Sequence, residues 1–516
     1  MSQLLQLPSE LLMKIIGLLD WKTLLICRKV CLAFRDYISS SLECQYAIEL
    51  AIAGLEDGPD STMILAERLQ RLREHQAAWR SLRWRTSRTI DMLRGGVWEL
   101  YGGVLAQARG RGTLVFEQLP SAIRGITEDQ WELVPKGLKS IRDFAMEPAY
   151  DLLVLVESAT AEGTYRIHLR SLRTGKPHPK ACNPAVLTHT PQGIEFSFAI
   201  SISGEYLGVL FISSDDHESQ ILVWNWCTGV LEMPSYHKAL KGQAIGSFGF
   251  LDDDRIMVGV VQHPEPALQI FNYKNASNNL TDIEDASFEC SLQLPTLQAW
   301  VAPLAMSVRS DPSPRWQPSP DLKVPFFTSR NDRLFVVTLW VAEGGTIYTL
   351  LLFVPLSTIM SRLKSRGSFG GEYVWDEWGP HGSRMMKAPG GHSMIWVCYV
   401  FGQSFVSPWR TEDYTEVPVG AKAIRILDFN QLAVKKDVAE GPDHEPAVTE
   451  VVQNSSVLEL GMILLHPVRT YLPYRTKTIR VPLHEDHAFN AVMLNEDTIV
   501  TVTSNPNVRQ YRILSF

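Results

Sequence analysis

Hydrophobic residues near the N-terminus recur at helical spacing. Two apolar stripes, with spacings of three and four, lie one residue apart: Leu11, Ile15 and Leu18, and Leu12, Ile16 and Leu19. Pro8 suits the first turn of a helix because it has no N–H to lose there, and Glu10 suits it because a helix N-terminus favours negative charge. Residues 8–20 are therefore predicted to form a helix with two apolar faces.

Two more short helices are predicted to follow, at residues 23–28 and 32–39. Asp20 can cap the first of them, and Phe34 and Ile38 give the second an apolar side. So small a unit buries too little of the surface that its unfolded chain exposes. The surplus apolar surface must therefore be covered by the rest of the chain or by another protein.

The order of residues in this segment resembles the F-box motif. The matching positions are Leu7-Pro8-x-Glu10, Ile15-Ile16, Leu18-Leu19, Leu24-Leu25, Val30-Cys31 and Phe34-Arg35. Phe34 stands where the motif more often has tryptophan, and it keeps an aromatic side chain there. The resemblance implies docking onto a Skp-family adaptor, which connects to a cullin and a RING protein in a ubiquitin ligase. An ordinary helical cap on the chain's own domain is the alternative.

The resemblance also implies which residues form the apolar surface left for the Skp-family adaptor. They are Leu7, Pro8, Leu11, Ile15, Leu18, Leu24, Leu25, Val30 and Cys31. Residues 1–41 are assigned to the F-box, and residues 42–95 to a helical connector. Apolar residues at helical spacing from Leu65 to Leu82 support the connector, and residues 54–60 are predicted to form a turn within it.

The connector carries an arginine-rich stretch, which raises the question of nucleic-acid binding. The same span contains only three acidic residues, Glu67, Glu74 and Asp91. Its eight arginines are Arg68, Arg71, Arg73, Arg80, Arg83, Arg85, Arg88 and Arg94. Trp79 and Trp84 fall on or near the apolar stripe and form no stacking platform beside the basic groups. We interpret the arginines as a solvated helix face and keep an RNA-associated scaffold as an alternative function.

From residue 97 onward, short apolar segments separated by turn residues replace the helical pattern. Three stretches share one shape, which is a short strand, a polar turn and an apolar strand: residues 143–156, 198–211 and 247–260. Their starts lie about 50 residues apart, which indicates a repeat architecture. Further copies are predicted at residues 326–337 and 489–502.

The repeats resemble the blades of a WD-type propeller. Residues 221–229 look like the closing strand and turn of such a blade, and residues 167–175 look similar, although the Trp-Asp dipeptide is missing. The predicted fold is mainly β with an N-terminal α-helical module. It comprises a three-helix F-box, connector helices, and an irregular β-propeller of six or seven blades over residues 96–516. Two or three β-sandwich domains are the main competitor, but no clear linker separates such domains.

Residues 508–516 are predicted to close the ring by pairing with strands near residues 97–119, because an open array would leave sheet edges unpaired. Two stretches break the strand pattern. Residues 302–326 hold six prolines, and residues 434–456 are polar and acidic. Both are predicted to be long exposed loops or disordered segments.

Composition narrows the possible functions. The formal net charge of −7 does not favour a dedicated nucleic-acid binder, and the seven scattered cysteines indicate no disulfide framework. No apolar run approaches the roughly 18 residues needed to span a membrane, and Glu10 and Lys14 interrupt the segment that a signal peptide would occupy. We therefore expect no membrane association and an intracellular location, cytoplasmic, nuclear or both.

No catalytic, cofactor-binding or metal-binding residue is predicted. The sequence lacks a nucleophile elbow and a phosphate-binding loop. His484 and His487 are three residues apart, whereas the metalloprotease helix motif needs four. Cys27, Cys31 and Cys44 have no fourth zinc ligand nearby and are interpreted as core thiols.

The resulting interpretation is a non-catalytic substrate-recognition adaptor of an SCF-type ubiquitin ligase. The F-box would bind a Skp-family adaptor and through it a cullin, and the propeller would bind an unknown protein client without a cofactor. The whole layout resembles the F-box proteins of mushroom-forming fungi. The competing hypothesis is a propeller hydrolase or lyase with a helical cap. Histidine and carboxylate side chains converging in a deep channel under packed-down N-terminal helices would favour it.

Overall fold

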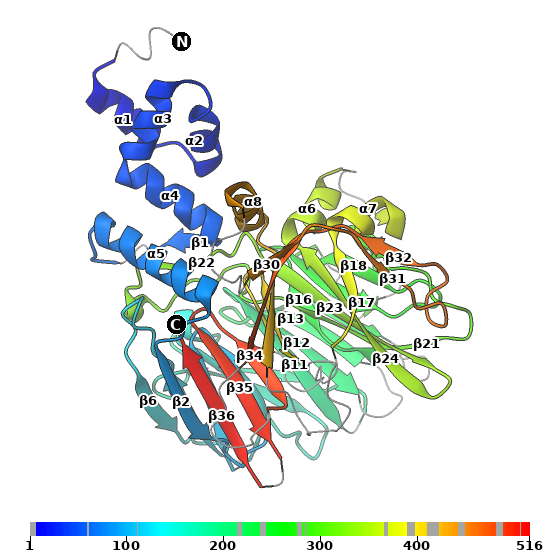
Figure 1. Ribbon diagram of the computed structural model, residues 1–516. Coiled ribbons are helices and arrows are strands. Elements are labelled where there is room, and N and C mark those ends of the chain that lie inside the picture. The colour runs from blue at the N-terminus through cyan, green and yellow to red at the C-terminus, as the bar shows by residue number, and fades with distance from the viewer. Residues whose placement is uncertain are drawn as a thin grey trace.

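The protein consists of an N-terminal helical arm and a ring of β-sheets, as the computed structural model shows (Figure 1). It describes residues 7–58, 61–110, 112–193, 195–213, 219–237, 244–275, 281–283, 286–365, 370–389, 398–409, 423–441, 449–480, 489–505 and 507–516. The arm contains α1 (Ser9–Gly17), α2 (Trp21–Cys27), α3 (Leu32–Ser40), α4 (Leu42–Ala53) and α5 (Leu65–Ser81). Helices α1–α3 stand away from the ring, and α4 and α5 connect them to it (Figure 1).

Local signals in the sequence set the ends of the arm helices. Asp20 caps α2 by accepting hydrogen bonds from the backbone N–H groups of Lys22 and Thr23 at 2.9 and 3.1 Å. Ser41 caps α4, and Gly54 ends it with a φ of +69°, which other residues rarely adopt. The helices predicted at residues 8–20, 23–28 and 32–39 are confirmed, with ends shifted by at most three residues.

Helix α4 belongs to two hydrophobic cores. One side of α4 completes the core of α1–α3, which contains Leu12, Ile16, Leu24, Phe34, Ile38, Cys44 and Ile48. Its other side, with Tyr46 and Leu50, packs on α5 and on Ile123 and Phe326 of the ring. Strand β1 (Leu55–Asp57) then pairs antiparallel with β22 (Phe326–Thr328). The arm is therefore joined to the ring by a shared core and by a strand pair.

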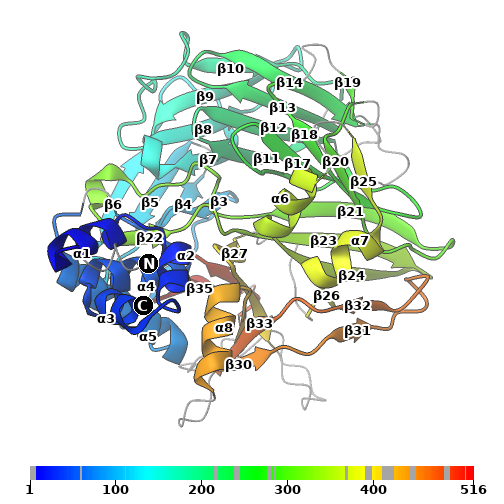
Figure 2. The ribbon, with the colours of Figure 1, turned by 90° about the horizontal axis from the view of Figure 1, so that it is seen from above.

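The ring is a β-propeller, and its described residues form seven blades of four or five strands (Figure 2). Across each sheet the strands of the first three blades are β3 (Trp98–Tyr101), β4 (Val104–Arg109), β5 (Thr113–Gln118) and β6 (Asp129–Leu133) in blade 1; β7 (Ile141–Glu147), β8 (Leu152–Glu157), β9 (Tyr165–Ser171) and β10 (Val186–His189) in blade 2; and β11 (Phe196–Ser203), β12 (Tyr206–Ser213), β13 (Ser219–Asn225), β14 (Val230–His237) and β19 (Thr281–Asp282) in blade 3.

The strands of the next two blades are β16 (Phe248–Phe250), β17 (Arg255–Val260), β18 (Ala267–Asn272), β20 (Cys290–Gln293) and β25 (Gly371–Tyr373) in blade 4, and β15 (Ala244–Ile245), β21 (Ala302–Arg309), β23 (Leu334–Glu343), β24 (Thr346–Pro355) and β26 (Arg384–Lys387) in blade 5. Blade 6 has β27 (Val400–Phe401), β28 (Ser404–Trp409), β29 (Ala423–Asp428), β33 (Tyr474–Arg480) and β30 (Thr449–Val452), and blade 7 has β34 (Ala491–Leu494), β35 (Thr498–Ser504), β36 (Arg509–Ser515) and β2 (Thr86–Asp91). The prediction of six or seven blades is thus confirmed at seven within the described part of the chain.

A strand from the connector closes the ring. Residues 42–95 are predicted to be a helical connector, but α5 ends at Ser81 and β2 pairs antiparallel with β36 as the outer strand of blade 7. The predicted partners of residues 508–516, near residues 97–119, belong to blade 1 instead. β2 is an edge strand whose one large aliphatic residue is Ile90, so it carries only a weak strand signal.

The predicted repeats are confirmed in four blades. Residues 143–156, 198–211 and 247–260 coincide with the pairs β7–β8, β11–β12 and β16–β17, and residues 489–502 coincide with β34–β35. The copy predicted at residues 326–337 is wrong, because β22 pairs with β1 of the arm and β21 pairs with β23 in blade 5.

Both segments predicted to be long exposed loops contain regular structure. Residues 302–309 form β21, where the ladder shifts register between Pro303 and Ala305 and so accommodates the proline. Trp316, farther along the same segment, is buried. Residues 434–456 include the end of α8 (Gln431–Glu440), strand β30 and the start of β31 (Ser456–Leu458), which pairs with β32 (Val468–Thr470). Residues 442–448 and the pair His484 and His487 lie outside the described residues.

Additional helices lie on the end of the ring that carries the arm. They are α6 (Leu356–Ser365), α7 (Trp375–Gly382) and α8 (Figures 1 and 2). Short 3-10 turns follow β7 at η2 (Pro148–Tyr150) and precede β22 at η3 (Pro320–Leu322). In the part of the chain that the structure describes, no helix has both the length and the apolar character needed to cross a membrane.

Candidate functional site

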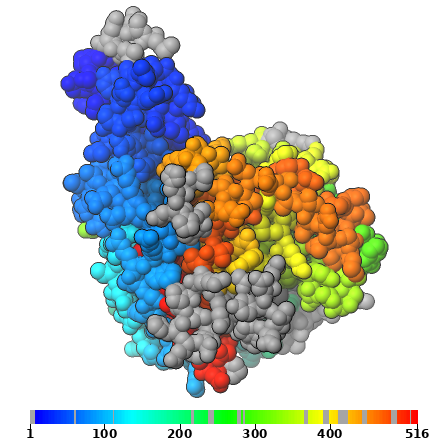
Figure 3. Space-filling view, in the orientation of Figure 1, coloured from blue at the N-terminus to red at the C-terminus, as the bar shows by residue number. Residues whose placement is uncertain are grey.

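The helical arm exposes a large apolar surface on its outer side. Within residues 7–45 of the arm, the large apolar side chains that are between 41% and 87% exposed are Leu11, Met13, Ile15, Leu18, Ile26, Val30, Leu32 and Leu42. The arm projects from the body of the molecule, which leaves its outer side clear of the propeller (Figure 3). Soluble monomers rarely expose so many neighbouring apolar residues, so this surface indicates a binding site for a partner.

The structure assigns opposite roles to the two apolar stripes of α1. Leu12 and Ile16 are 1% and 3% exposed and lie in the core of the arm, whereas Leu11 and Ile15 are 48% and 41% exposed. Leu18 ends the outer stripe and is 87% exposed. The outer stripe is therefore the surplus face that the sequence indicates, because the core of the arm is already filled by the inner stripe.

The residues predicted to contact an adaptor fall into three groups. Pro8, Leu11, Ile15, Leu18 and Val30 are exposed, and Leu7, Leu25 and Cys31 are half-buried. Leu24 is 1% exposed in the core of the arm. We correct its assignment from a contact residue to a core residue, because periodicity alone does not show which neighbour of the Leu24-Leu25 pair points inward.

Sequence reasoning missed part of the exposed surface. Met13, Ile26, Leu32 and Leu42 are exposed but were not among the predicted contact residues. Met13, Ile26 and Leu32 each lie next to a core residue or a motif position, so their apolar character was the available signal, whereas Leu42 lies beyond the motif. Only the three-dimensional structure shows that these side chains are left uncovered by the rest of the chain.

Comparison with protein-family models identifies the N-terminal part of the arm. Residues 4–45 match the F-box domain. This segment is an F-box domain. The F-box thus includes α1–α3 and the first turn of α4, and it extends slightly beyond the predicted boundary at residue 41. An F-box followed by a β-propeller is an arrangement typical of non-catalytic substrate adaptors.

Other comparisons give weak or no matches. A search of curated protein sequences gives no match. Among solved structures, an uncharacterized protein from Listeria monocytogenes aligns with 59% of this chain and 82% of its own, at 10% identity and a TM-score of 0.28. A DUF4221-family member from Bacteroides vulgatus aligns with 77% of this chain and 98% of its own, at 10% identity and a TM-score of 0.29. The core factor of S. cerevisiae aligns with 78% of this chain and 58% of its own, at 10% identity and a TM-score of 0.22.

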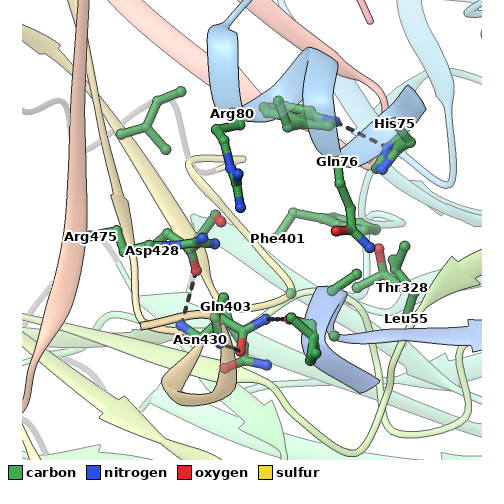
Figure 4. A pocket seen from close by; sticks show the side chains of 18 of the residues that line it. Leu55, His75, Gln76, Arg80, Thr328, Phe401, Gln403, Asp428, Asn430 and Arg475 are labelled. Atoms are coloured by element: carbon green, nitrogen blue, oxygen red, sulfur yellow. Dashed lines mark hydrogen bonds and ion pairs between the residues drawn. The ribbon is translucent and has the colours of Figure 1, made fainter. Parts of the chain in front are cut away.

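A pocket of about 160 Å³ lies where the helical arm meets blades 6 and 7 (Figure 4). Asn430 connects three elements there. Its side-chain oxygen accepts hydrogen bonds from the N–H groups of Leu432 and Ala433 at the start of α8, both at 3.1 Å. Its side-chain nitrogen donates to the carbonyl of Ile52, near the end of α4, at 2.9 Å. Asn430, which follows the end of β29, therefore links α4 to the start of α8.

The charged groups of this junction pocket are satisfied within the protein. Arg475 binds Asp428 directly and reaches Asp437 at 3.0 Å. Lys477 is 7% exposed and donates a hydrogen bond to the carbonyl of Trp79 in α5 at 2.7 Å. Burial, assisted by the charge of Arg475, lowers the pKa of Lys477 to about 7. We assign the pocket a structural role, which is to hold the arm in a fixed orientation on the propeller.

Most of the arginine-rich stretch is also paired. Ion pairs join Arg68 to Asp57, Arg71 to Glu67, Arg73 to Glu49, Arg80 to Asp437, Arg85 to Glu74 and Arg88 to Glu128. Leu69, Leu72 and His75 of α5 are buried on the other side of the helix. This arrangement supports a structural role for the arginines and weakens the RNA hypothesis, because few of their charges are left for phosphate groups.

A second cavity, of about 420 Å³, occupies the centre of the ring. The first strands of blades 1–4 and strand β21 of blade 5 line it, and they bring together Glu99, Asp143, Arg309 and Asp311. No histidine lines it among the residues that the structure describes. The hydrolase or lyase hypothesis requires histidines and carboxylates that converge beneath N-terminal helices packed against the ring. The carboxylates are present, but α1–α3 stand away from the ring (Figure 1).

Beside this cavity, Glu147 is expected to make stability depend on pH. Glu147 is 1% exposed, and burial raises its pKa to about 8, although the N–H of Ala149 opposes the shift. The folded state therefore keeps a proton that the unfolded state loses near its ordinary pKa of 4.5. The stability contributed by this group is present below pH 4.5 and is lost as the pH rises through about 8.

In the variant Glu147→Gln, the side chain is neutral at every pH and keeps an oxygen that can accept a hydrogen bond from the N–H of Ala149. We expect it to unfold at a higher temperature than the wild type at pH 9 and at a similar temperature at pH 4, measured by thermal denaturation. The exposed Glu162→Gln serves as the control and should show no such pH-dependent gain. Equal melting temperatures for Glu147→Gln and the wild type at pH 9 would contradict the prediction.

Proposed function

We propose that this protein is the substrate-recognition adaptor of an SCF-type ubiquitin ligase. Its F-box binds a Skp-family adaptor, and through it a cullin, while the propeller holds a protein client. The single observation that carries the proposal is the outer apolar side of an F-box whose own core is already complete. The proposed contact surface consists of Leu7, Pro8, Leu11, Ile15, Leu18, Leu25, Val30 and Cys31, extended by Met13, Ile26, Leu32 and Leu42.

The connection between the F-box and the propeller supports this role. Helix α4 contributes to the cores of both units, β1 pairs with β22, and Tyr46 donates hydrogen bonds to Asp57 and to the carbonyl of Pro325, both at 2.9 Å. A rigid connection suits an adaptor, because it holds a bound client at a defined distance from the ubiquitin-conjugating enzyme. In this function the chain makes and breaks no covalent bond.

Affinity purification of the full chain beside a chain lacking residues 1–41 tests the proposal. The full chain should recover a Skp-family protein and a cullin, and the shortened chain should lose both but keep its clients. Immunoblotting or mass spectrometry of the recovered proteins gives the result. Absence of any Skp-family protein from the full-chain sample would overturn the assignment.

A further inference from the structure

A segment of blade 5 crosses the end of the central cavity that faces the F-box arm. This segment, residues 310–316, is called the plug below. It contacts blade 6, where Gly402 donates its N–H to the carbonyl of Asp311 at 2.7 Å. It also contacts blade 1, where the Tyr101 hydroxyl accepts from the N–H of Ser313 at 3.1 Å, and blade 4, where Arg315 donates to Asp253 at 2.8 Å.

Aromatic side chains and a buried arginine complete this closure. Trp316 is 2% exposed and meets Tyr101 of blade 1 and Phe401 of blade 6 edge-on, with ring centroids 5.6 and 6.1 Å apart. Arg333 donates to the carbonyls of Pro312 in the plug and Phe250 in blade 4. The chain then continues into β22 beside the arm. The plug therefore closes the cavity at the end that faces the helical arm, and we expect a ligand to enter from the opposite end.

On the walls of the cavity, carboxyl groups outnumber basic groups, and some polar atoms have no partner within the described chain. Glu99, Asp143 and Asp311 line it together with a single guanidinium, that of Arg309, whose charge acts on Asp143 and on Asp311. Three buried oxygens on its walls have no hydrogen-bond partner within the described chain: Oε2 of Glu99 and the hydroxyls of Ser310 and Ser313. Ser313 is 8% exposed, so its unpartnered hydroxyl is a feature of the interior and not of the surface.

We propose that the central cavity binds an organic cation, an alkylammonium or guanidinium group, between Glu99, Asp143 and Asp311, with the hydroxyls of Ser310 and Ser313 accepting its N–H bonds. A cation supplies several N–H donors and no acceptor, which matches a wall of carboxylates and free hydroxyl oxygens. The volume of about 420 Å³ lies within the range of small-ligand sites and is larger than the volume of a single water molecule.

This cation has two possible sources, a lysine or arginine side chain of a protein client or a free small amine. The first source rests on the proposed function, because it makes the cavity the place where the client is recognised. The chemistry of the cavity is independent of the F-box. Binding of cations is therefore measured on the full chain without a Skp-family protein, and failure of either proposal leaves the other intact.

The ionisation of the carboxyls supports a pH-dependent site. Burial raises the pKa of Asp143 and of Asp311 to about 6, and burial with the charges of Asp143 and Asp311 raises the pKa of Glu99 well above its usual range. The other charged groups acting on them are Arg142 and Arg309 on Asp143, Arg309 and Arg333 on Asp311, and Glu147 on Glu99. Because a cation prefers ionised carboxylates, binding should strengthen as the pH rises from 5 to 8.

Isothermal titration calorimetry of the full chain tests the proposal with matched probes. Blocked arginine and blocked lysine, each with an acetylated amine and an amidated carboxyl, represent a client side chain, and agmatine and cadaverine represent free amines. Blocked citrulline has nearly the shape of arginine without its charge. We expect at least one of the charged probes to bind and blocked citrulline not to bind. The binding should be stronger at pH 8 than at pH 5. Tighter binding of the blocked amino acids indicates a client side chain, and tighter binding of the amines indicates a free amine.

Substitutions locate the binding to the cavity. Asp311→Asn should weaken it by about tenfold or more, since a charged hydrogen-bond acceptor becomes neutral. The exposed Asp321→Asn, nearby in η3, should leave it unchanged. If Asp311→Asn fails to fold, Asp143→Asn takes its place with the same expected loss. Lack of binding by every charged probe, equal binding of citrulline, or unchanged affinity in the folded cavity variants would overturn the proposal.

Discussion

Replacing Leu11, Ile15 and Leu18 together by serine is expected to weaken binding to a Skp-family adaptor by about 1000-fold or more. These three residues form the outer stripe of α1 and are 41% to 87% exposed. Burying one apolar side chain of this size in an interface contributes about 1.5–3 kcal/mol at most, and about 1.4 kcal/mol corresponds to a tenfold change in affinity. Binding to a purified Skp-family protein, measured by calorimetry or surface plasmon resonance, gives the result.

The same substitutions should leave the fold intact, because the core of the arm is formed by the inner stripe. The matched control replaces Val134, Val230 and Ile347 by serine, since these residues are 52% to 65% exposed and belong to the propeller. The control should bind like the wild type. If the α1 variant keeps its melting temperature and also keeps its affinity, the outer stripe is not the Skp contact and the proposed surface is wrong.

Arg124→Met is expected to destabilise the protein by about 3–5 kcal/mol, because it leaves buried negative charge without its partner. Arg124 lies between β5 and β6, and its guanidinium contacts Glu496 and Asp497 of blade 7, with distances of 2.7 Å to Glu496 and 2.7 Å from Nε to Asp497. It also donates to the carbonyl of Phe326 in β22 at 3.1 Å. The side chains of Arg124, Glu496 and Asp497 are each 5% exposed.

This cluster also reaches the arm, because His75 of α5 lies 3.3 Å from Asp497. Burial opposes ionisation of Asp497, but Arg124 and His75 outweigh it and lower the pKa of that carboxyl. The loss of stability should therefore appear at neutral pH, in urea or thermal unfolding. Arg109→Met removes an exposed ion pair with Glu132 and should change stability by less than about 1 kcal/mol. An equally small effect of Arg124→Met would show that the cluster contributes little to holding blades 1 and 7 together.

Local features of the sequence were enough to predict the helices of the F-box and four of the blade hairpins. Asp20 and Gly54 act on helix ends through hydrogen bonds and dihedral angles within a few residues. The pairs β7–β8, β11–β12, β16–β17 and β34–β35 are hairpins, so each forms between neighbouring parts of the chain. Such short-range interactions leave a readable pattern of apolar and turn residues.

Features built from distant residues were not predictable in this way. The pairing of β2 with β36 joins Thr86 to Ser515, and its edge position removes the need for a strongly apolar strand. The proline-rich segment was expected to be exposed, yet as the plug it contacts blades 1, 4 and 6. Its composition resembles that of a loop, and only the closed ring supplies the surfaces that bury it.

The pattern of apolar and polar residues was enough to predict an F-box-like helical unit with surplus apolar surface, followed by a repeated β-structure. The folded molecule was needed to show that Leu11 faces outward and Leu24 inward, that the ring has seven blades in its described part, and that Glu99, Asp143 and Asp311 meet in one cavity. Periodicity defines the faces of a helix or strand, but what covers each face depends on contacts between segments far apart in the chain.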